Sequence, residues 1–222
     1  KAKSRKKEVN QFIKMIKANG LSDTYKFVMN KLEAPSPLGY SCAGKVIGVS
    51  DGVKKIKVGD LVACGGQGAY HADVVSVPSN LIVKIPKNID IKQAAFTTIA
   101  SIAIQGIRQA DLRMGENCSI IGMGLIGQLT YKILESSGIF PIGIDVDSNH
   151  VEYVKNIGLK NVYDRNVSNI ETAIRDFSNG YGTDAVIITA GTSSKDPIEF
   201  AGKIARKKGK VIIVGSVPTG FT

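Results

Sequence analysis

The feature that most constrains the fold is a strand, a glycine-rich turn and a helix in direct succession near the middle of the chain. An apolar run at 118–121 leads into Gly122, Gly124 and Gly127, which form the pattern GxGxxG. This succession predicts a βαβ unit whose turn brings backbone N–H groups to the start of a helix. The helix is indicated by Ile126, Leu129, Thr130 and Ile133, which share one face at helical spacing.

The same alternation continues along the chain and predicts a parallel sheet. Short apolar runs that favour strands alternate with amphipathic segments that favour helices. We therefore predict an α/β fold with a Rossmann-type, doubly wound parallel sheet over residues 99–222. Its strand order should be 3-2-1-4-5-6, and we expect the sixth strand to be missing because the chain ends after the fifth. The expected strands are 118–122, 141–145, 161–163, 184–189 and 210–215.

The first part of the chain has a different pattern of predicted secondary structure. Residues 1–37 predict a hairpin of two amphipathic helices, one around Val9, Phe12, Ile13 and Ile16 and one around Tyr25, Val28, Met29 and Leu32. Residues 38–98 contain short strand-like segments separated by turn signals, and they predict part of a small β-barrel or sandwich. The expected strands lie in AGKVIGVS, KVGDLVAC, YHADVVSVP and NLIVKIP, and an apolar helix over 91–110 would follow them.

The glycine pattern predicts a dinucleotide site. Gly122 suits a tight turn, Gly124 permits close approach of a pyrophosphate, and Gly127 allows the helix to pack closely on the strand. Leu125 and Ile126 then begin the helix and would offer free N–H groups to the phosphates. A glycine turn that binds no ligand is the alternative.

An acidic residue ends the second strand of this pattern. Asp145 lies 18 residues after Gly127, where a carboxylate would accept hydrogen bonds from a ribose and repel a 2′-phosphate. We therefore expect NAD(H) rather than NADP(H), with Asp147 as the alternative acid. Small residues end two later strands and would either line the same crevice or simply form strand-to-helix turns. They are Ala190, Gly191 and Gly215.

Charge, cysteine content and hydropathy narrow the class of protein. The formal net charge is +10, and residues 1–33 hold nine of the basic side chains against three acidic ones. No nucleic-acid-binding motif follows them, so we expect a solvated helical face and no nucleic-acid partner; binding of nucleic acid through this segment is the alternative.

Three widely spaced cysteines predict neither a disulfide framework nor a zinc lobe. Because no apolar run is long enough to cross a bilayer, we expect a soluble, cytoplasmic protein without a membrane partner.

A family resemblance rests on three segments: GYSCAGKVIGVSDGVKKIKVGDLVA, VPSNLIVKIP and the fingerprint GMGLIG. Together they resemble the medium-chain dehydrogenase/reductase superfamily of zinc alcohol dehydrogenase-like proteins, over about residues 38–222. The resemblance implies a partial GroES-like catalytic domain over 38–98 and an NAD-binding Rossmann domain over 99–222. More narrowly, the chain looks like bi-domain oxidoreductases, in which such a dehydrogenase is fused to a Gfo/Idh/MocA-like domain and often encoded with polysaccharide genes.

The sequence departs from this family at the zinc ligands. Zinc members usually read Gly-His-Glu where Gly39, Tyr40 and Ser41 stand here, and a ligand Cys falls near Thr97. The third ligand would lie ahead of residue 1, and the four-cysteine structural lobe is missing. Since these side chains are poor zinc ligands, zinc is not expected as a cofactor. Cys42 is interpreted as a small buried residue rather than a nucleophile.

Without zinc, a side chain would have to donate a proton or a hydrogen bond to the carbonyl oxygen that gains charge during hydride transfer. Tyr40, at the former ligand position, is the first candidate, unless it is only a packed barrel residue. His71 is the second, unless it is merely exposed. Gln105 shares a helix face with Arg108, which would hold an acidic substrate or only pair with Asp111.

These observations favour a zinc-independent, NAD(H)-dependent oxidoreductase that acts on an alcohol or carbonyl of a small-molecule substrate. The narrower resemblance implies a sugar or sugar nucleotide in polysaccharide biosynthesis. The alternative is a non-catalytic dinucleotide-binding sensor or scaffold. A homo-oligomer, and a second oxidoreductase domain fused outside this chain, are left open as partners. The chain lacks an initial Met, which suggests a fragment.

Overall fold

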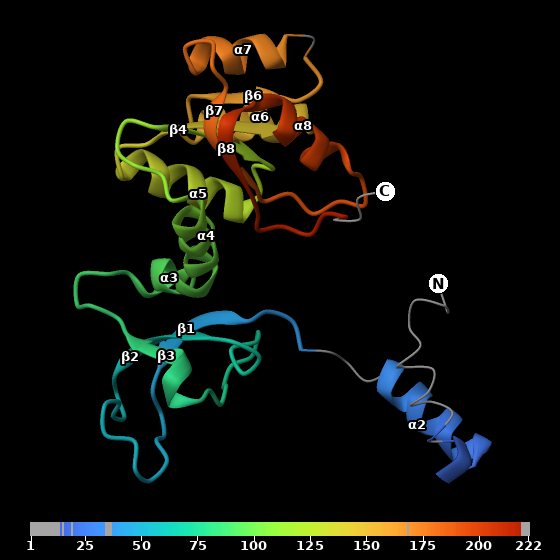
Figure 1. Ribbon diagram of the computed structural model, residues 1–222. Coiled ribbons are helices and arrows are strands. Elements are labelled where there is room, and N and C mark those ends of the chain that lie inside the picture. Colours follow the sequence, from blue (N-terminus) through green and yellow to red (C-terminus); the bar gives the residue numbers. More distant parts are fainter. Residues whose placement is uncertain (1–13, 15, 19, 34–36, 168, 219–222) are drawn as a thin grey trace. The chain divides into compact units, whose positions relative to one another are not determined.

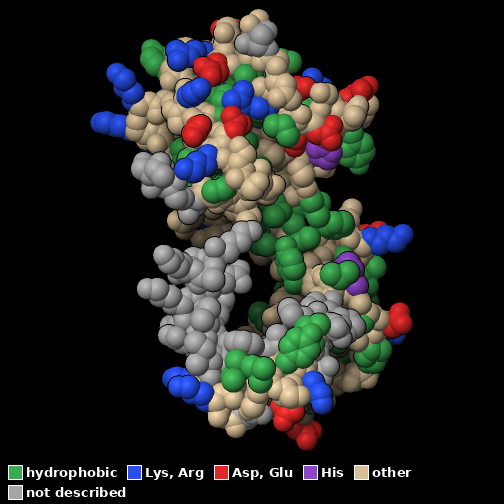
Figure 2. Space-filling model, turned by 90° about the vertical axis from the view of Figure 1, so that its right-hand side faces the viewer, with side chains coloured by type: hydrophobic (Ala, Val, Ile, Leu, Met, Phe, Trp, Pro, Cys, Tyr) green, Lys and Arg blue, Asp and Glu red, His purple; other side chains and the backbone are tan. Residues whose placement is uncertain are grey.

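The chain forms two compact units. The computed structural model describes residues 14–218 apart from 15, 19, 34–36 and 168 (Figure 1). The units are Lys1–Gly39 and Tyr40–Thr222. On the face shown in Figure 2, basic and acidic side chains intermingle, so the positive charge of the described residues is not gathered there into one continuous basic patch.

The first unit contains α2 (Leu21–Glu33), which confirms the second predicted helix. Residues 16–18 are also helical. Most of the first predicted helix, including Val9, Phe12 and Ile13, lies outside the described residues, so the helical hairpin stays a prediction.

The second unit begins with a small antiparallel sheet. Its strands are β1 (Ser41–Lys45), β2 (Leu61–Gly65) and β3 (Ile82–Lys84), with β2 in the middle. The turn residues Gly52 and Gly59 adopt φ values of 88° and 94°, which favour glycine. Strands therefore form in KVGDLVAC and NLIVKIP, although each is shorter than predicted, whereas β1 overlaps AGKVIGVS only at 43–45 and begins two residues ahead of it.

The strand predicted in YHADVVSVP is wrong. Val77 packs against the buried cluster of the small sheet, but Val74 is 65% exposed. The backbone of residues 70–78 is irregular. In the described part of the sheet, β1 and β3 each pair with β2, and neither pairs with this loop. Apolar residues between turn signals therefore did not require a ladder partner here.

A parallel sheet with helices on both faces forms the rest of the unit, as predicted. The strand order is β6-β5-β4-β7-β8, which in chain order is 3-2-1-4-5 and confirms the predicted topology. None of the described helices is long and apolar enough to span a bilayer. The strands are β4 (Asn117–Ile121), β5 (Phe140–Asp145), β6 (Val162–Asp164), β7 (Thr183–Ile188) and β8 (Ala205–Ile213); the helices are α5 (Leu125–Ser136), α6 (Ser148–Asn156), α7 (Ile170–Phe177) and α8 (Asp196–Ile204).

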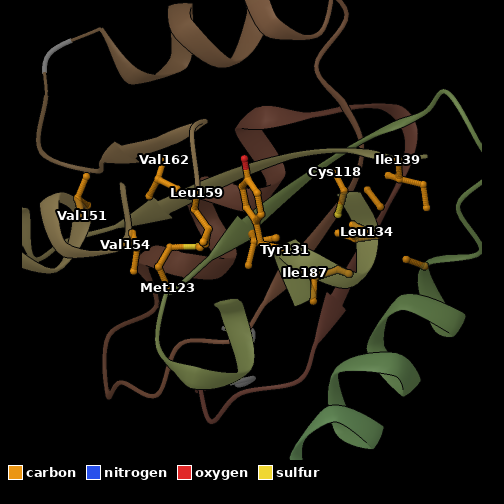
Figure 3. Close-up of a cluster of buried hydrophobic side chains, with 13 residues drawn as sticks. Cys118, Met123, Tyr131, Leu134, Ile139, Val151, Val154, Leu159, Val162 and Ile187 are labelled. Carbon is orange, nitrogen blue, oxygen red and sulfur yellow. The ribbon is translucent and has the colours of Figure 1, made fainter. Parts of the chain in front are cut away.

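Each face of this sheet has its own hydrophobic core. On one face, α5 and α6 bury Tyr131, Leu134 and Val154 against Ile120 of β4 (Figure 3). On the other face, α7 and α8 bury a second cluster that includes Ile121, the next residue of β4. Because successive side chains of a strand point to opposite faces, the apolar runs of the sequence supply both cores at once.

The predicted helix over 91–110 forms as two helices, α3 (Ile91–Ala94) and α4 (Thr97–Ala110). The break falls at Ala95, whose carbonyl accepts a hydrogen bond of 2.6 Å from the Ser41 hydroxyl of β1. Helix α4 contacts β2 of the small sheet and β7 of the parallel sheet. The helical segment therefore connects the two sheets, as expected from the sequence.

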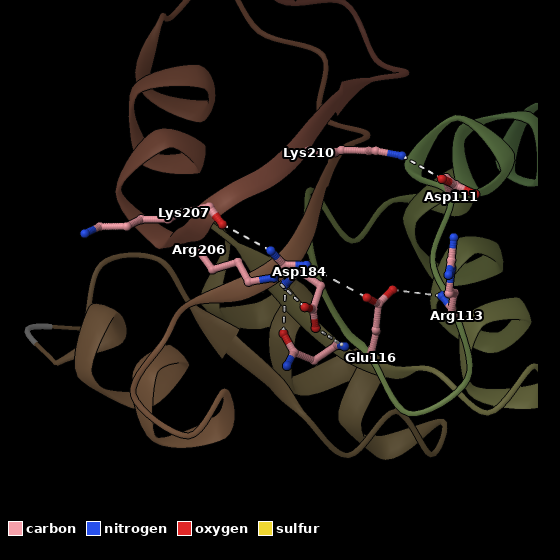
Figure 4. Close-up of polar contacts among 8 residues, drawn as sticks. Asp111, Arg113, Glu116, Asp184, Arg206, Lys207 and Lys210 are labelled. Carbon is pink, nitrogen blue, oxygen red and sulfur yellow. Dashed lines mark hydrogen bonds and ion pairs between the residues drawn. The ribbon is translucent and has the colours of Figure 1, made fainter.

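Strand β8 begins at Ala205, earlier than the predicted residue 210. The basic run that opens it resembles a loop in sequence, but Arg206 Nε donates a hydrogen bond of 2.6 Å to Asp184 Oδ1 (Figure 4). Asp184 Oδ2 in turn accepts one of 2.8 Å from the backbone N–H of Asn117. These polar contacts hold the first residues of β4, β7 and β8 together, at the edge of the sheet opposite the glycine-rich turn.

Candidate functional site

The glycine-rich turn follows β4 at the carboxyl edge of the parallel sheet. Gly122 adopts φ 98°, so the expected tight turn is present. A Cβ on Gly122 would lie 2.7 Å from the backbone N of Ala190, and a Cβ on Gly127 would collide with the carbonyl of Gly122. Both positions therefore need glycine for the packing of the turn itself.

Gly124 is different, because a Cβ there would meet nothing within 4 Å. Its φ of −60° and ψ of −171° are open to any residue, and it is the N-cap of α5. The fold therefore does not require glycine at this position. Since the first N–H groups of a helix have no partner within the helix, the open space at Gly124 lies beside free donors of Leu125 and Ile126. This combination suits a diphosphate that lies against the backbone.

Asp145 ends β5 and supports the same turn. Its Oδ2 accepts a hydrogen bond of 2.6 Å from the Met123 N–H, and its Oδ1 accepts one of 3.1 Å from the Asp147 N–H. Each carboxylate oxygen has a second lone pair, so the group can still accept a ribose hydroxyl. Asp147, the alternative acid, instead caps α6 by accepting hydrogen bonds from Asn149 and His150.

Two side chains at this site were not found by sequence reasoning. The Met123 carbonyl lies 2.8 Å from His150 Nε2 and accepts a hydrogen bond of 2.9 Å from Gln128 Nε2. Asp145 thus contacts the N–H of Met123, while His150 and Gln128 contact its carbonyl. His150 is one of only two histidines in the chain and stands in the first turn after the acid-bearing strand. This position in the sequence could have indicated that His150 lies near the site. Its contact with Met123, however, spans 27 positions, and no local sequence pattern predicts such a contact.

The three small residues from later strands gather around the turn. Ala190 donates a backbone hydrogen bond of 3.0 Å to Ile121, and a Cβ on Gly215 would collide with the Ala190 carbonyl. Tight packing thus accounts for glycine at 215, in line with the alternative of a structural turn. Gly191 has open space around it and stays a predicted cofactor contact.

The predicted catalytic side chains are exposed. Tyr40 is 46% exposed at the start of β1, and His71 and Gln105 lie on a loop and on α4 respectively. Among the described residues, no hydrogen bond or ion pair joins these side chains to the glycine-rich turn. Their catalytic roles stay predictions.

The ion pair suggested between Arg108 and Asp111 is not the one that Asp111 forms. Asp111 forms an ion pair of 3.0 Å with Lys210. The hydrogen bond from Lys210 is the main cause of a pKa for Asp111 below its usual value. Arg108 is exposed on α4.

In the segments where the related family carries zinc ligands, around Tyr40 and Thr97, three hydroxyl groups donate to backbone carbonyls. Ser41 donates to the Ala95 carbonyl at 2.6 Å, Thr97 donates to the Ala94 carbonyl at 2.7 Å, and Thr98 donates to the Cys64 carbonyl at 3.3 Å. These hydroxyls are committed to backbone acceptors and are poor zinc ligands. In the part of the chain that the structure describes, no three His, Cys, Asp or Glu side chains lie close enough to hold a metal ion. Among the described residues, the side chains at these positions therefore do not make up the ligand set of a catalytic zinc, and the absence of zinc stays a prediction.

Comparison with known proteins gives two family matches. A model described as alcohol dehydrogenase GroES-like domain matches residues 13–87, and one described as zinc-binding dehydrogenase matches residues 126–222. The first match crosses the boundary predicted at residue 38, and the domain boundaries stay predictions.

Curated relatives are distant in sequence. The chain is 28% identical over 204 residues to an uncharacterised zinc-type alcohol dehydrogenase-like protein of Haemophilus influenzae, covering 77% of this chain and 60% of the relative. It is 23% identical to the 2-dehydro-3-deoxy-L-galactonate 5-dehydrogenase of Pseudoalteromonas atlantica, covering 86% of this chain and 63% of the relative. The chain thus spans about 60% of the length of these relatives.

Solved structures share the fold. A putative zinc-binding dehydrogenase from Sinorhizobium meliloti 1021, bound to NADP, superposes with a TM-score of 0.71 at 21% identity, covering 85% of this chain and 64% of that one. At this identity the likeness shows the fold alone. Residues 13–87 and 126–222 thus match the alcohol dehydrogenase GroES-like and zinc-binding dehydrogenase families, and the shared fold agrees with these two matches.

Proposed function

We propose that this chain binds NAD(H) at the turn between β4 and α5 and belongs to an oxidoreductase that interconverts an alcohol and a carbonyl. The observation that carries the proposal is the open space at Gly124, beside the free N–H groups of α5 and within the turn that Asp145 supports. A glycine that the fold does not need, at the place where a diphosphate would approach, is accounted for by the ligand.

The acid at the end of β5 supports NAD(H) over NADP(H). A 2′-phosphate on the ribose would meet the negative charge of Asp145. One candidate cation, Arg165, follows β6, but its guanidinium forms an ion pair of 3.0 Å with Asp196 and lies 3.7 Å from the Phe200 ring. It is therefore engaged elsewhere and is not directed at the ribose. One solved structure with this fold is bound to NADP, so we base the preference for NAD(H) on such local charges.

Bound NAD(H) supplies the hydride, and this chain would supply the oxygen chemistry. As a carbonyl is reduced, its oxygen gains negative charge and needs a donor. The Tyr40 hydroxyl is exposed, so it is free to donate a proton or a hydrogen bond to such an oxygen. His71 and Gln105 remain second candidates. We propose zinc-independent chemistry because Tyr40 and Thr97 stand where zinc relatives carry ligands, and the Thr97 hydroxyl donates to the Ala94 carbonyl.

The substrate class rests on resemblance. One relative is named for a reaction on a deoxy sugar acid, and the narrower likeness to bi-domain oxidoreductases favours a sugar or sugar nucleotide in polysaccharide biosynthesis. A fused second oxidoreductase domain and a cytoplasmic location belong to the same proposal. The alternative, a dinucleotide sensor or scaffold without turnover, is supported by the absence of a zinc ligand set among the described residues.

Replacing Asp145 with Asn tests the cofactor preference. An Asn keeps an oxygen acceptor for the Met123 N–H but removes the charge that repels a 2′-phosphate. We expect the ratio of the NADPH to the NADH dissociation constant to fall at least about tenfold, which corresponds to about 1.4 kcal/mol. Titration of both cofactors by NAD(P)H fluorescence measures this ratio.

The matched control is Asp147→Asn, which changes the neighbouring acid that caps α6. We expect it to leave the cofactor ratio unchanged. An Asp145→Asn protein that retains the wild-type ratio would refute the role of Asp145. A control that shifts the ratio equally would assign the role to Asp147.

Turnover separates the enzyme from the sensor. The chain, and any longer protein that contains it, should oxidise NADH in the presence of keto sugars if it is an oxidoreductase. Saturable NADH binding without turnover across such substrates in the longer protein would favour the sensor.

A further inference from the structure

A pair of cysteines in the small sheet lies outside the candidate dinucleotide site. Cys42 of β1 and Cys64 of β2 are direct cross-strand partners. In the same register, the N–H of Gly66 donates a hydrogen bond of 3.0 Å to the carbonyl of Tyr40. Hydrogen-bonded pairs alternate along an antiparallel ladder, so the cysteines, two positions further along, also form a hydrogen-bonded pair. The Cα atoms of such pairs lie about 5.5 Å apart.

The two side chains share one face of the sheet. Direct cross-strand partners point the same way, and both cysteines line a cavity of about 770 Å³ beside the small sheet. Both also belong to the same hydrophobic cluster, with Val62 and Ala69. Burial, and then the adjacent Cys42 thiol, raises the pKa of Cys64 to about 11. The separation of hydrogen-bonded partners falls within the range of about 4.4–6.8 Å that a disulfide spans between Cα atoms.

The pair is unequal in exposure. Cys42 is half-buried at the cavity wall, whereas Cys64 is only 7% exposed. The third cysteine, Cys118, is completely buried in the core of the parallel sheet. A reagent that enters the cavity therefore meets Cys42 first, with Cys64 directly behind it and Cys118 out of reach.

We propose that Cys42 and Cys64 form a reversible cross-strand disulfide, and that the pair is a site of oxidative modification by small-molecule disulfides such as oxidised glutathione. The Cys42 thiolate attacks one sulfur of the reagent and expels the first glutathione thiolate, leaving a mixed disulfide. The Cys64 thiolate then attacks the Cys42 sulfur and expels the second. Two protein thiols are oxidised, and one reagent disulfide is reduced to two thiols.

The bond would lie at a connection between the two sheets. The Cys64 carbonyl accepts the hydrogen bond from Thr98 of α4, and Ser41, next to Cys42, donates to the Ala95 carbonyl. A disulfide here ties together the two strands on which the helical connection rests. It also lies two residues from Tyr40, the first predicted proton donor.

The test treats the folded chain with oxidised glutathione, quenches with an alkylating reagent and maps the cysteines by mass spectrometry. We expect the wild-type chain to lose two hydrogens, to retain no glutathione and to yield a peptide that links Cys42 to Cys64. Cys118 should stay unreacted until the chain is unfolded, which shows that the fold is intact during the reaction.

Two single variants assign the order of events. Cys64→Ser should trap one glutathione on Cys42, because no second thiol can release it. Cys42→Ser should react at least about tenfold more slowly than Cys64→Ser, because its remaining cavity thiol is buried and mostly protonated near neutral pH. Thermal unfolding of each variant checks that both stay folded.

Three results would overturn the proposal. The wild-type chain would remain fully reduced under conditions that modify Cys64→Ser, or it would keep glutathione as a stable mixed disulfide. Alternatively, the linked peptides would join Cys42 or Cys64 to Cys118 or to a second chain.

Discussion

At the scale of single residues, the glycines of the turn have separable roles. Gly122 and Gly127 are required by packing, since a Cβ on either meets backbone atoms, whereas Gly124 is surrounded by open space. The sequence pattern predicted three different roles, and the turn and packing roles follow from local stereochemistry. The contact between His150 Nε2 and the Met123 carbonyl could not be predicted, because it depends on how α6 packs beside the turn.

Replacing Gly122 with Ala should destabilise the fold. The residue adopts φ 98°, and its Cβ would lie 2.7 Å from the backbone of Ala190. Strain of this kind costs about 1–3 kcal/mol, which lowers the melting temperature of a chain of this size by several degrees. Differential scanning calorimetry measures the change.

Gly124→Ala is the matched control, because its Cβ enters open space at an ordinary φ. It should melt closer to the wild type than Gly122→Ala does, because it loses only the preference for glycine over alanine at a helix N-cap. Equal destabilisation by both substitutions would contradict the separation of roles.

At the scale of elements, apolar runs located the strands well because buried parallel strands are apolar on both faces. The apolar pattern failed to locate a strand boundary where polar contacts set that boundary. β8 begins within a basic run because Arg206 is held by Asp184, a partner 22 positions away that no local pattern reveals. In the small sheet, the apolar residues at 70–78 predicted a strand, but among the described residues this segment has no ladder partner.

The small sheet should be sensitive to acid through Asp60. A hydrogen bond and ion pair of 2.7 Å with Lys84 of β3, together with the backbone N–H of Lys57, lower the pKa of Asp60 below its usual 3.8. A lowered folded-state pKa contributes stability above the unfolded pKa, and this contribution is lost as pH falls through the folded pKa. Asp60→Asn should therefore be less stable than wild type near neutral pH.

The difference should shrink below about pH 4, as the wild-type carboxylate gains a proton. Urea unfolding of both proteins between pH 7 and about pH 3 measures it. A difference that is constant over this range would show that the charge of Asp60 contributes nothing.

At the scale of the whole molecule, the topology followed from the sequence, since alternating strands and helices with short connections allow few arrangements. The chemistry did not follow in the same way. The candidate donors Tyr40, His71 and Gln105 come from different segments of the chain. Whether one of them contacts a substrate depends on the tertiary arrangement of these segments, which no single sequence motif predicts.

The replacement of two zinc ligands by Tyr40 and Thr97 gives a prediction for the whole molecule. The purified chain should contain far less than one zinc per chain by elemental analysis, and NADH binding should survive treatment with a chelator. One tightly bound zinc per chain, or NADH binding that the chelator abolishes, would contradict the zinc-independent account.

The most direct test of the central claim is NADH titration of Gly124→Val. A Cβ at Gly124 meets nothing within 4 Å, and the Val side chain would extend into the space where the diphosphate would approach. The matched control is Gly202→Val in α8, a glycine that also has open space. We predict that Gly124→Val stays folded at the assay temperature and weakens NADH binding at least about tenfold, while Gly202→Val binds NADH like the wild type. Unchanged NADH affinity in folded Gly124→Val would contradict the assignment of the dinucleotide site.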